Sequence, residues 1–308
     1  MNRPVIAVEH LTKRFGEVIA VNNLTFTVTY GDLFGLVGPD GSGKTTLIRL
    51  LAGIMTPSAG QGNVLGSDLA TGISAVRKHI GYLSQGSHLY NDLTVDENLR
   101  FFAGIFQLTS EHEQERIAEL LSFSRLEPFR DRLAGQLSGG MRRKLALCCA
   151  MIHSPSLFLL DEPTTGVDPV SREEVWELIR SVWRDGATFL ISTPYMDEAE
   201  LCTRVGFLYQ GALLHEGSPA DLKKLLPGEI WEVRCDEMRK AREILGKLRE
   251  VGKVNLFGDR LHLQLDPGEE RWSLFEAMLQ KEGIRMVSKE PIEPTLEDIF
   301  LLLVNRDG

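Results

Sequence analysis

A glycine-rich stretch carries the first residue spacing that could do chemistry. It reads Gly38, Pro39, Asp40, Gly41, Ser42, Gly43, Lys44 and Thr45, which fits the phosphate-loop pattern GxxxxGK[ST]. The glycines let successive backbone N–H groups face one concave surface and bind phosphate oxygens there. The ammonium of Lys44 can hold β- and γ-phosphates, and the Thr45 hydroxyl can bind Mg²⁺. The stretch, with Thr46, predicts a nucleotide site; the alternative is a glycine-rich turn that caps a core helix.

A pair of carboxylates follows an apolar run further along the chain. Asp161 and Glu162 come directly after residues 158–160, Phe-Leu-Leu, which read as the end of a strand. There Asp161 can join the ligands of Mg²⁺, and Glu162 can polarise a water for in-line attack on the γ-phosphorus. The alternative for an Asp-Glu pair is a solvated surface turn, and the preceding apolar run argues against it. Phosphate loops occur in kinases, GTPases and ATPases, so a further motif has to choose among them.

A serine and two glycines at a predicted helix start make that choice. The stretch reads Leu137, Ser138, Gly139, Gly140 and Met141. Ser138 and the N–H groups of the two glycines can form a second anion site at the helix start. With the other motifs, this stretch resembles the LSGGQ signature of ABC transporter nucleotide-binding subunits, and the resemblance covers residues 5 to about 226. It implies that two such units close head to tail around two ATP molecules, each lying between one phosphate loop and the other unit's signature.

The same resemblance implies roles for three more positions. Phe15 occupies the aromatic position that stacks on adenine, although a place in the core is the alternative for a lone Phe in a hairpin. Gln85 matches the glutamine that reaches Mg²⁺ and the attacking water and that links the core to a helical insert. Asp168, within the stretch Gly-Val-Asp-Pro at 166–169, matches the loop that crosses the dimer interface.

The helical insert, residues 86 to about 153, is where the family receives cytoplasmic helices of a transmembrane partner. Tyr90, Phe101, Phe102 and Phe106 are candidate contacts for that partner. A place in the core of the insert is an equally weighted alternative for these four aromatic side chains.

One position departs from the family pattern. Where the family has a histidine that contacts the γ-phosphate, this sequence has Pro194. Proline offers no side-chain donor and no backbone N–H. With Thr193 as N-cap, however, Pro194 at the first helical position favours the start of the following helix. We therefore expect the chain's own site to bind Mg-ATP but to hydrolyse it slowly, although Glu162 is kept.

An ATP site that lacks this histidine implies a second ATP-binding unit, because in the family such a site usually lies beside one that hydrolyses ATP efficiently. That unit belongs to the same full-length chain, to a second copy or to a different partner. The ending, residues 304–308, suggests the first half of a duplicated protein or a piece cut from one. Residues 293–300 resemble the accessory region of ABC-2-type exporter ATPases, which include duplicated drug-efflux subunits.

Periodicity places these motifs on an α/β fold. Short alternating runs at 5–10, 18–22 and 24–29 predict an antiparallel start. Strands at 33–37, 80–84, 157–161 and 187–193 and helical stretches between them predict a parallel sheet, with a helix over 45–53 and mostly helical structure over 91–152. The predicted fold is a P-loop NTPase core with an antiparallel β subdomain and a helical insert.

The last quarter of the chain predicts a second domain. A boundary at Pro227-Gly228 separates residues 1–228 from an accessory domain, 229–308. Beyond it we expect strand 230–235, helix 238–251, two strands around a turn at 258–259, helix 270–281 and strand 284–289, followed by a helix from Thr295. The order βαββαβ matches a ferredoxin-like α+β domain.

Composition and net charge limit the classes of function that the chain can have. The 308 residues include 43 acidic and 34 basic side chains, which leaves a formal net charge of −9 and gives no help to nucleic-acid binding. The longest apolar run, 145–152, is too short to span a bilayer, and the N-terminus has no signal-peptide pattern. We expect a cytoplasmic protein held at the inner membrane face by ABC-2-type transmembrane subunits.

The leading hypothesis is thus an ATP-driven motor subunit of an exporter with ATP and Mg²⁺ as cofactors. One alternative is a non-transport cytosolic ABC ATPase that acts on ribosomes or DNA, which the acidic charge disfavours. Another is a binding-only clamp, in which ATP closes a dimer without useful turnover; Pro194 supports that reading for the chain alone.

Overall fold

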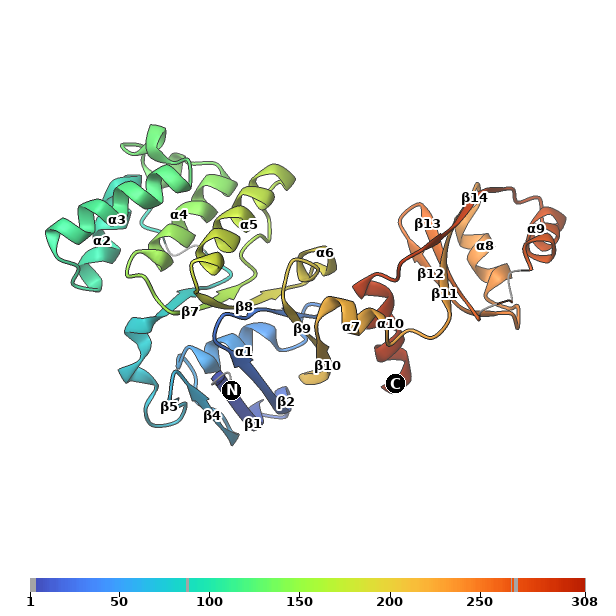
Figure 1. Cartoon of the computed structure of the whole chain (residues 1–308), viewed down its shortest axis with the longest axis horizontal. Coiled ribbons are helices and arrows are strands. Elements are labelled where there is room, and N and C mark those ends of the chain that lie inside the picture. The colour runs from blue at the N-terminus through green and yellow to red at the C-terminus, as the bar shows by residue number, and fades with distance from the viewer. Residues whose placement is uncertain (1–3, 87–88, 267, 269–270, 308) are drawn as a thin grey trace. The chain divides into compact units, whose positions relative to one another are not determined.

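The computed structural model describes residues 4–86, 89–266, 268 and 271–307. The chain divides into two compact units, residues 1–218 and 219–308 (Figure 1). The sequence-predicted boundary at 227–228 lies inside the second unit, because helix α7 (Pro219–Lys223) packs on α10 (Leu296–Asp307). Within the described residues, none of the helices combines the length and the apolar character that crossing a membrane requires.

An antiparallel sheet begins the first unit. Its order is β2-β1-β4-β5, and its strands are β1 (Pro4–Phe15), β2 (Val18–Thr29), β4 (Ala59–Val64) and β5 (Ser67–Asp68). The runs expected as separate strands at 18–22 and 24–29 form the single strand β2; Asn23, with a φ of 53°, lies where the register with β1 shifts, and the strand continues past it. Strand β4 was missed because its sequence, Ala-Gly-Gln-Gly-Asn-Val, is rich in glycine and mostly exposed.

A second sheet of six strands, ordered β10-β9-β3-β8-β7-β6, forms the centre of this unit. Its strands are β3 (Leu33–Val37), β6 (Ile80–Leu83), β7 (Leu157–Asp161), β8 (Thr188–Thr193), β9 (Arg204–Tyr209) and β10 (Ala212–Gly217). Every residue of β3, β7 and β8 is buried, as expected for parallel strands covered on both faces. The predicted parallel strands are confirmed, whereas β9 and the antiparallel β10 were not predicted.

Helices cover both faces of the central sheet. Helix α1 (Lys44–Leu51) lies between the two sheets and shares one apolar core with them, and α4 (Gly139–Met151) and α5 (Pro169–Arg184) lie on the opposite face (Figure 1). The insert is mainly helical, as predicted, with α2 (Val95–Ile105) and α3 (Ser110–Phe123) before α4. The remaining helix of this unit is α6 (Met196–Ala199), and short 3₁₀ turns occupy Ile73–Ala75, Arg77–His79, Glu127–Phe129 and Ala134–Gln136.

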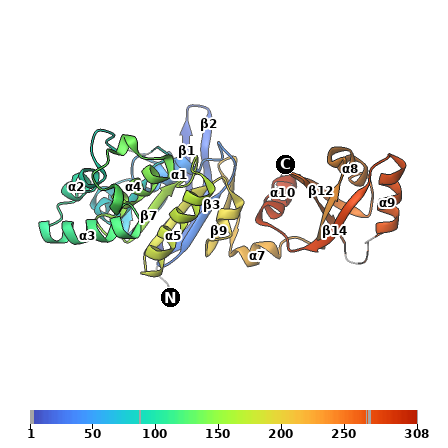
Figure 2. The same cartoon turned by 90° about the horizontal axis from the view of Figure 1, so that it is seen from above.

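The second unit has the predicted ferredoxin-like arrangement. Its elements are β11 (Glu229–Cys235), α8 (Met238–Leu245), β12 (Val251–Phe257), β13 (Arg260–Leu265), α9 (Trp272–Lys281) and β14 (Met286–Ile292), with sheet order β12-β13-β11-β14 and antiparallel pairing throughout. Helices α8 and α9 cover one face of this sheet and α10 lies on the other (Figure 2). The side chains of β13 therefore alternate between the two faces of the sheet. Leu261 and Leu263 join the core under α8 and α9, whereas the Nδ1 of His262 lies 3.0 Å from the Oδ1 of Asp298 on α10. Helix α8 ends at Leu245, earlier than predicted, because the chain from Val251 pairs as β12.

Candidate functional site

The phosphate-loop residues connect β3 to the start of α1. Gly41 and Gly43 have φ angles of 78° and 105°, which residues with a Cβ adopt only under strain. A Cβ at position 43 would also lie 2.2 Å from the carbonyl oxygen of Ala20. Lys44 is only 3% exposed, and its ammonium donates to the carbonyls of Gly38 at 2.8 Å and Pro39 at 3.0 Å. The loop is thus fixed by close packing and by its own lysine.

A pocket of about 260 Å³ lies against this loop. Its walls are made of Ala20, Asp40, Gly41, Gly43, Lys44, Thr45, Thr46, Gln85 and Glu162. The sequence-predicted groups for phosphate, metal and water therefore meet at one place. Phe15 is not among the lining residues; it is 47% exposed, with the Lys13 ammonium 5.2 Å from its ring centre. The core alternative for Phe15 is wrong, and stacking on adenine stays a prediction.

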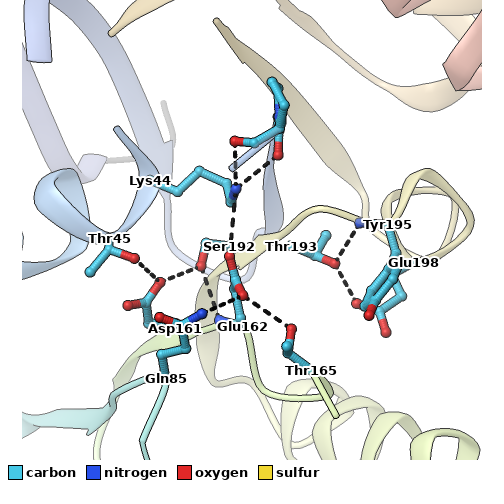
Figure 3. Close-up of polar contacts among 12 residues, drawn as sticks. Lys44, Thr45, Gln85, Asp161, Glu162, Thr165, Ser192, Thr193, Tyr195 and Glu198 are labelled. Atoms are coloured by element: carbon cyan, nitrogen blue, oxygen red, sulfur yellow. Dashed lines mark hydrogen bonds and ion pairs between the residues drawn. The ribbon is translucent and has the colours of Figure 1, made fainter. Parts of the chain in front are cut away.

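Asp161 ends β7 and is fully buried; it does not itself line the pocket but contacts Thr45, which does. Its Oδ1 accepts from the hydroxyls of Thr45 at 3.1 Å and Ser192 at 2.7 Å (Figure 3). Its Oδ2 is buried and has no hydrogen-bond partner within the described part of the chain. A carboxylate oxygen left in this way beside a threonine hydroxyl suits a hard divalent cation such as Mg²⁺, which prefers oxygen ligands. The residues present therefore fit the metal that the motif implies.

Glu162 is held in an unusual backbone conformation. Its φ is +50°, a left-handed value that costs a residue with a side chain on the order of 1–3 kcal/mol and persists only where its surroundings enforce it. The side chain is enclosed, and its Oε1 lies 3.5 Å from the Lys44 ammonium. Its Oε2 accepts from the Gln85 amide at 3.0 Å and from the Thr165 hydroxyl at 3.1 Å (Figure 3). The carboxylate is thus aimed at the loop lysine and at the glutamine predicted to act with it.

Ser192, in β8, is a site residue that sequence reasoning missed. Its hydroxyl donates to Asp161 and accepts from the backbone N–H of Glu162 at 3.0 Å, and its carbonyl accepts from the same N–H at 3.1 Å. One side chain on a neighbouring strand therefore orients both carboxylate residues. A polar residue inside an otherwise apolar buried strand was the available signal.

The signature residues begin α4 away from the pocket. Ser138 is the N-cap, and its Oγ accepts from the Met141 N–H at 3.2 Å. Ser138 and Gly139 are exposed, whereas Gly140 is buried against Ser171 of α5. Asp168 is the N-cap of α5, and the backbone N–H of Ser171, 3.0 Å from its Oδ1, lowers the pKa of this carboxyl. The predicted signature and the predicted interface loop therefore lie side by side.

Two family models match the chain. One, described as "ABC transporter", matches residues 21–165, and the other, described as "ATP-binding protein DrrA1-3-like, C-terminal domain", matches residues 217–304. Nod factor export ATP-binding protein I of Rhizobium sp. (strain N33) is 37% identical over 311 residues, which cover 100% of this chain and 99% of that relative. This chain belongs to the ATP-binding subunits of ABC transporters. Subunits of this family bind ATP and are ATPases.

Further relatives and solved structures agree with this ABC assignment. The probable multidrug ABC transporter ATP-binding protein YbhF of Escherichia coli (strain K12) is 41% identical over 219 residues, which are 71% of this chain and 38% of YbhF. The chain thus spans well under half of that relative. A solved ATP-binding subunit of an ABC transporter matches with a TM-score of 0.65 and 29% identity, covering 72% of this chain and 92% of its own. The dimeric cassette MJ0796, bound to ADP and Pi, matches with a TM-score of 0.63 and 25% identity, covering 69% and 98%.

The segment after β8 corrects one expectation for this ABC subunit. Thr193 is the last residue of β8 rather than a helix N-cap, and α6 begins at Met196 with Tyr195 as N-cap. The Thr193 hydroxyl still accepts from the Tyr195 N–H at 3.1 Å, but it donates to Glu198 at 2.6 Å (Figure 3). Pro194 therefore lies in the connection between strand and helix, so its predicted place at the first helical position is wrong.

Glu198 organises the same region of the ABC subunit. It is 2% exposed and accepts hydrogen bonds from Thr193 and, at 2.5 Å, from the Thr164 hydroxyl. The Arg172 Nε lies 2.8 Å from its Oε1, and the Arg172 guanidinium lies 4.4 Å from the ring centre of Tyr195. These contacts tie the segment around Pro194 to the segment that follows Glu162.

A larger groove of the ABC subunit, about 830 Å³, lies between the central sheet and the insert. Among its lining residues are Ile54, Phe102, Ile105, Phe106 and His153. The ring of Phe106 stacks on His153 with a centroid separation of 3.5 Å. Tyr90 and Phe101 contact each other edge to face at 4.5 Å and are 48% and 39% exposed, so the insert-core alternative is wrong for these two.

Proposed function

We propose that this chain is the ATP-binding motor of an exporter, which dimerises head to tail around ATP and drives efflux through separate transmembrane subunits of the ABC-2 type. The separation of the signature from the chain's own nucleotide pocket carries the proposal. Ser138 and Gly139 are exposed at the start of α4, where the first N–H groups of a helix have no intrahelical partner, and among the described residues none of 137–141 lines the pocket. An anion site placed in this way needs a phosphate from another nucleotide-binding unit.

Within its own pocket the chain supplies the groups for binding Mg-ATP. Backbone N–H groups of residues 40–46 and the Lys44 ammonium bind the phosphates, and Thr45, Gln85 and Asp161 would hold Mg²⁺, whose charge would offset that of the phosphate oxygens. Glu162 accepts a proton from the attacking water and Gln85 orients it, as their 3.0 Å contact supports. Lys44, 3.5 Å from Glu162, moves toward the phosphates when ATP enters, which frees the carboxylate for that role.

Turnover at this pocket is proposed to be slow. Pro194 has no donor to place on the γ-phosphate, so the site lacks one source of stabilisation for the charge of the transition state. Productive hydrolysis then belongs to a second ATP-binding unit, in the same full-length protein, in a second copy or in an unlike partner. If that unit hydrolyses nothing either, the pair acts as a clamp that ATP closes, which is the second candidate function.

The groove beside the insert is proposed to receive the cytoplasmic helices of the transmembrane partner. It is mostly apolar, and Phe102 and Phe106 line it. Nod factor export ATP-binding protein I is named for export and YbhF for a multidrug ABC transporter, which favours a membrane partner over ribosomes or DNA.

Copurification from native membranes tests this proposal. The tagged chain should retain a transmembrane protein, and Phe102→Arg, which places a charge in the groove, should release it. Phe123→Arg is the matched control, because Phe123 is 46% exposed on α3 and does not line the groove. Retention of ribosomes or DNA in place of a membrane protein would favour the non-transport alternative.

A further inference from the structure

Arg143 is a buried charge whose five N–H groups all meet backbone carbonyls. It lies on α4, five positions after Ser138, and is 6% exposed. A guanidinium carries five N–H donors: one on Nε and two on each Nη. Nε donates to Pro163, Nη1 to Ser84 and Gln85, and Nη2 to Asp161 and Glu162, at distances between 2.5 and 3.2 Å. Each donor thus has one carbonyl acceptor.

These acceptors belong to two loops that carry the predicted chemistry. Strands β6 and β7 are parallel neighbours, paired from Ile80 with Leu157 to Leu83 with Leu160. Ser84 and Gln85 follow the first strand, and the segment from Asp161 to Pro163 ends the second. One side chain from the signature helix therefore fixes the exits of both strands. It also fixes the carbonyl of Glu162, whose left-handed backbone needs outside support.

The charge on Arg143 persists in this setting. Burial lowers the pKa of its guanidinium to about 10, and the charges of Asp161 and Glu162 oppose that shift. Arg143 is therefore protonated at neutral pH and retains all five donors. A flexible ammonium could not reproduce this planar arrangement, because it has three donors and no fixed fork.

We propose that Arg143 is a positioning residue that couples the signature helix to the Mg²⁺ end of the chain's own nucleotide site. The inference rests on the proposed function, since it takes Asp161 and Gln85 as groups that act on Mg-ATP. Any shift of α4 when its signature meets the partner's ATP moves the five carbonyl contacts with it. The loops that carry Gln85, Asp161 and Glu162 then shift together, whereas the phosphate loop, which Arg143 does not touch, stays in place.

Mg²⁺-dependent ATP binding by the intact chain tests this inference. Dissociation constants for a fluorescent ATP analogue are measured in EDTA and in Mg²⁺ for the wild type, Arg143→Lys and Arg143→Gln. The gain in affinity that Mg²⁺ provides should fall about tenfold in Arg143→Lys, as expected when one or two hydrogen bonds to the loops are lost. Affinity in EDTA should change less than about twofold, because the phosphate loop is untouched.

Arg116→Lys is the matched control. Arg116, on α3, donates to the carbonyl of Met151 at 3.2 Å and contacts Glu119, away from the pocket. The Arg116→Lys variant should keep the wild-type dissociation constants in EDTA and in Mg²⁺. The coupling would be overturned if Mg²⁺ increased the ATP affinity of Arg143→Lys as much as that of the wild type, or if the variant lost equal affinity in EDTA and in Mg²⁺. It would also be overturned if neither Arg143 variant folded, because the residue would then serve stability alone. A wild type that does not bind ATP at all would instead contradict the proposed function.

Discussion

The Oγ of Ser171 occupies the space that a side chain at position 140 would need. A Cβ added to Gly140 would lie 2.2 Å from this oxygen and 2.4 Å from the Ser171 Cβ. The signature backbone is therefore pressed against the first turn of α5, which Asp168 caps. Gly140 serves the contact between the two segments predicted to face a partner, in addition to any contact with phosphate.

Gly140→Ala should lower the free energy of unfolding by about 1–3 kcal/mol, the usual effect of an added carbon in a closely packed place. Urea unfolding measures the change. Gly139→Ala is the matched control, since the nearest atom to its added Cβ is 3.9 Å away. Ser171→Gly should restore most of the stability of Gly140→Ala. Equal stability of the two alanine variants would refute the close packing at position 140.

Ser138→Arg should block ATP-dependent dimerisation and leave ATP binding by the monomer intact. The arginine side chain cannot cap α4 as the serine hydroxyl does, and it fills the surface on which the other unit's phosphates are proposed to lie. Sedimentation in a Glu162→Gln background, which slows hydrolysis, reports the dimer, and a fluorescent nucleotide reports binding. If the monomer lost its ATP affinity, the signature would belong to the chain's own pocket and the head-to-tail assignment would fail.

Acid should destabilise the first unit partly through His153. Burial lowers the pKa of this imidazole to about 4. The unfolded chain therefore takes up a proton first as the pH falls, so the contribution of neutral His153 is complete above about pH 6.5 and is lost on the way to pH 4. Between pH 6.5 and 5 the loss should be on the order of 1 kcal/mol, less than the full value of roughly 1.4 kcal/mol per pH unit, because the ring is partly exposed and its interactions are screened by solvent.

His153→Gln removes that titration while keeping a donor for the Ile80 carbonyl, which the ring meets at 3.2 Å. Its unfolding free energy should depend less on pH than that of the wild type. His112→Gln, at an exposed position on α3, is the control and should keep the wild-type pH dependence. Identical pH profiles for wild type and His153→Gln would contradict this prediction, because they would show that His153 contributes nothing to the pH dependence of the unfolding free energy.

Local sequence was enough to predict the parts of the fold that repeat a known pattern. Apolar runs located β3, β7 and β8, and the βαββαβ order predicted the second unit. Strand β4 escaped because its residues are largely exposed, and β10 escaped because its residues are nearly all half-buried and show no alternation of buried and exposed positions. The start of α6 was misplaced because the Thr193 hydroxyl is engaged by Glu198, a contact that spacing alone does not favour over an N-cap.

The candidate site was predictable where a motif names its residues and hidden where contacts cross the fold. The loop lysine, Asp161 and Glu162 follow from spacing, and the structure brings them together. Ser192 and Arg143 act from other elements, through contacts 31 and 20 positions apart in the chain. A polar residue in a buried strand and an arginine in an apolar helix mark such positions, but only the packed structure identifies their partners.

Phosphate release by the purified chain tests the central claim most directly. Wild type should bind Mg-ATP but turn over slowly, and Pro194→His should raise the rate roughly tenfold or more by restoring a donor to the γ-phosphate. Pro194→Ala is the control, because it restores the backbone N–H without adding a side-chain donor, and it should stay slow. Brisk wild-type hydrolysis that Glu162→Gln abolishes and Pro194→His leaves unchanged would contradict the account of this pocket as a binding site with weak turnover.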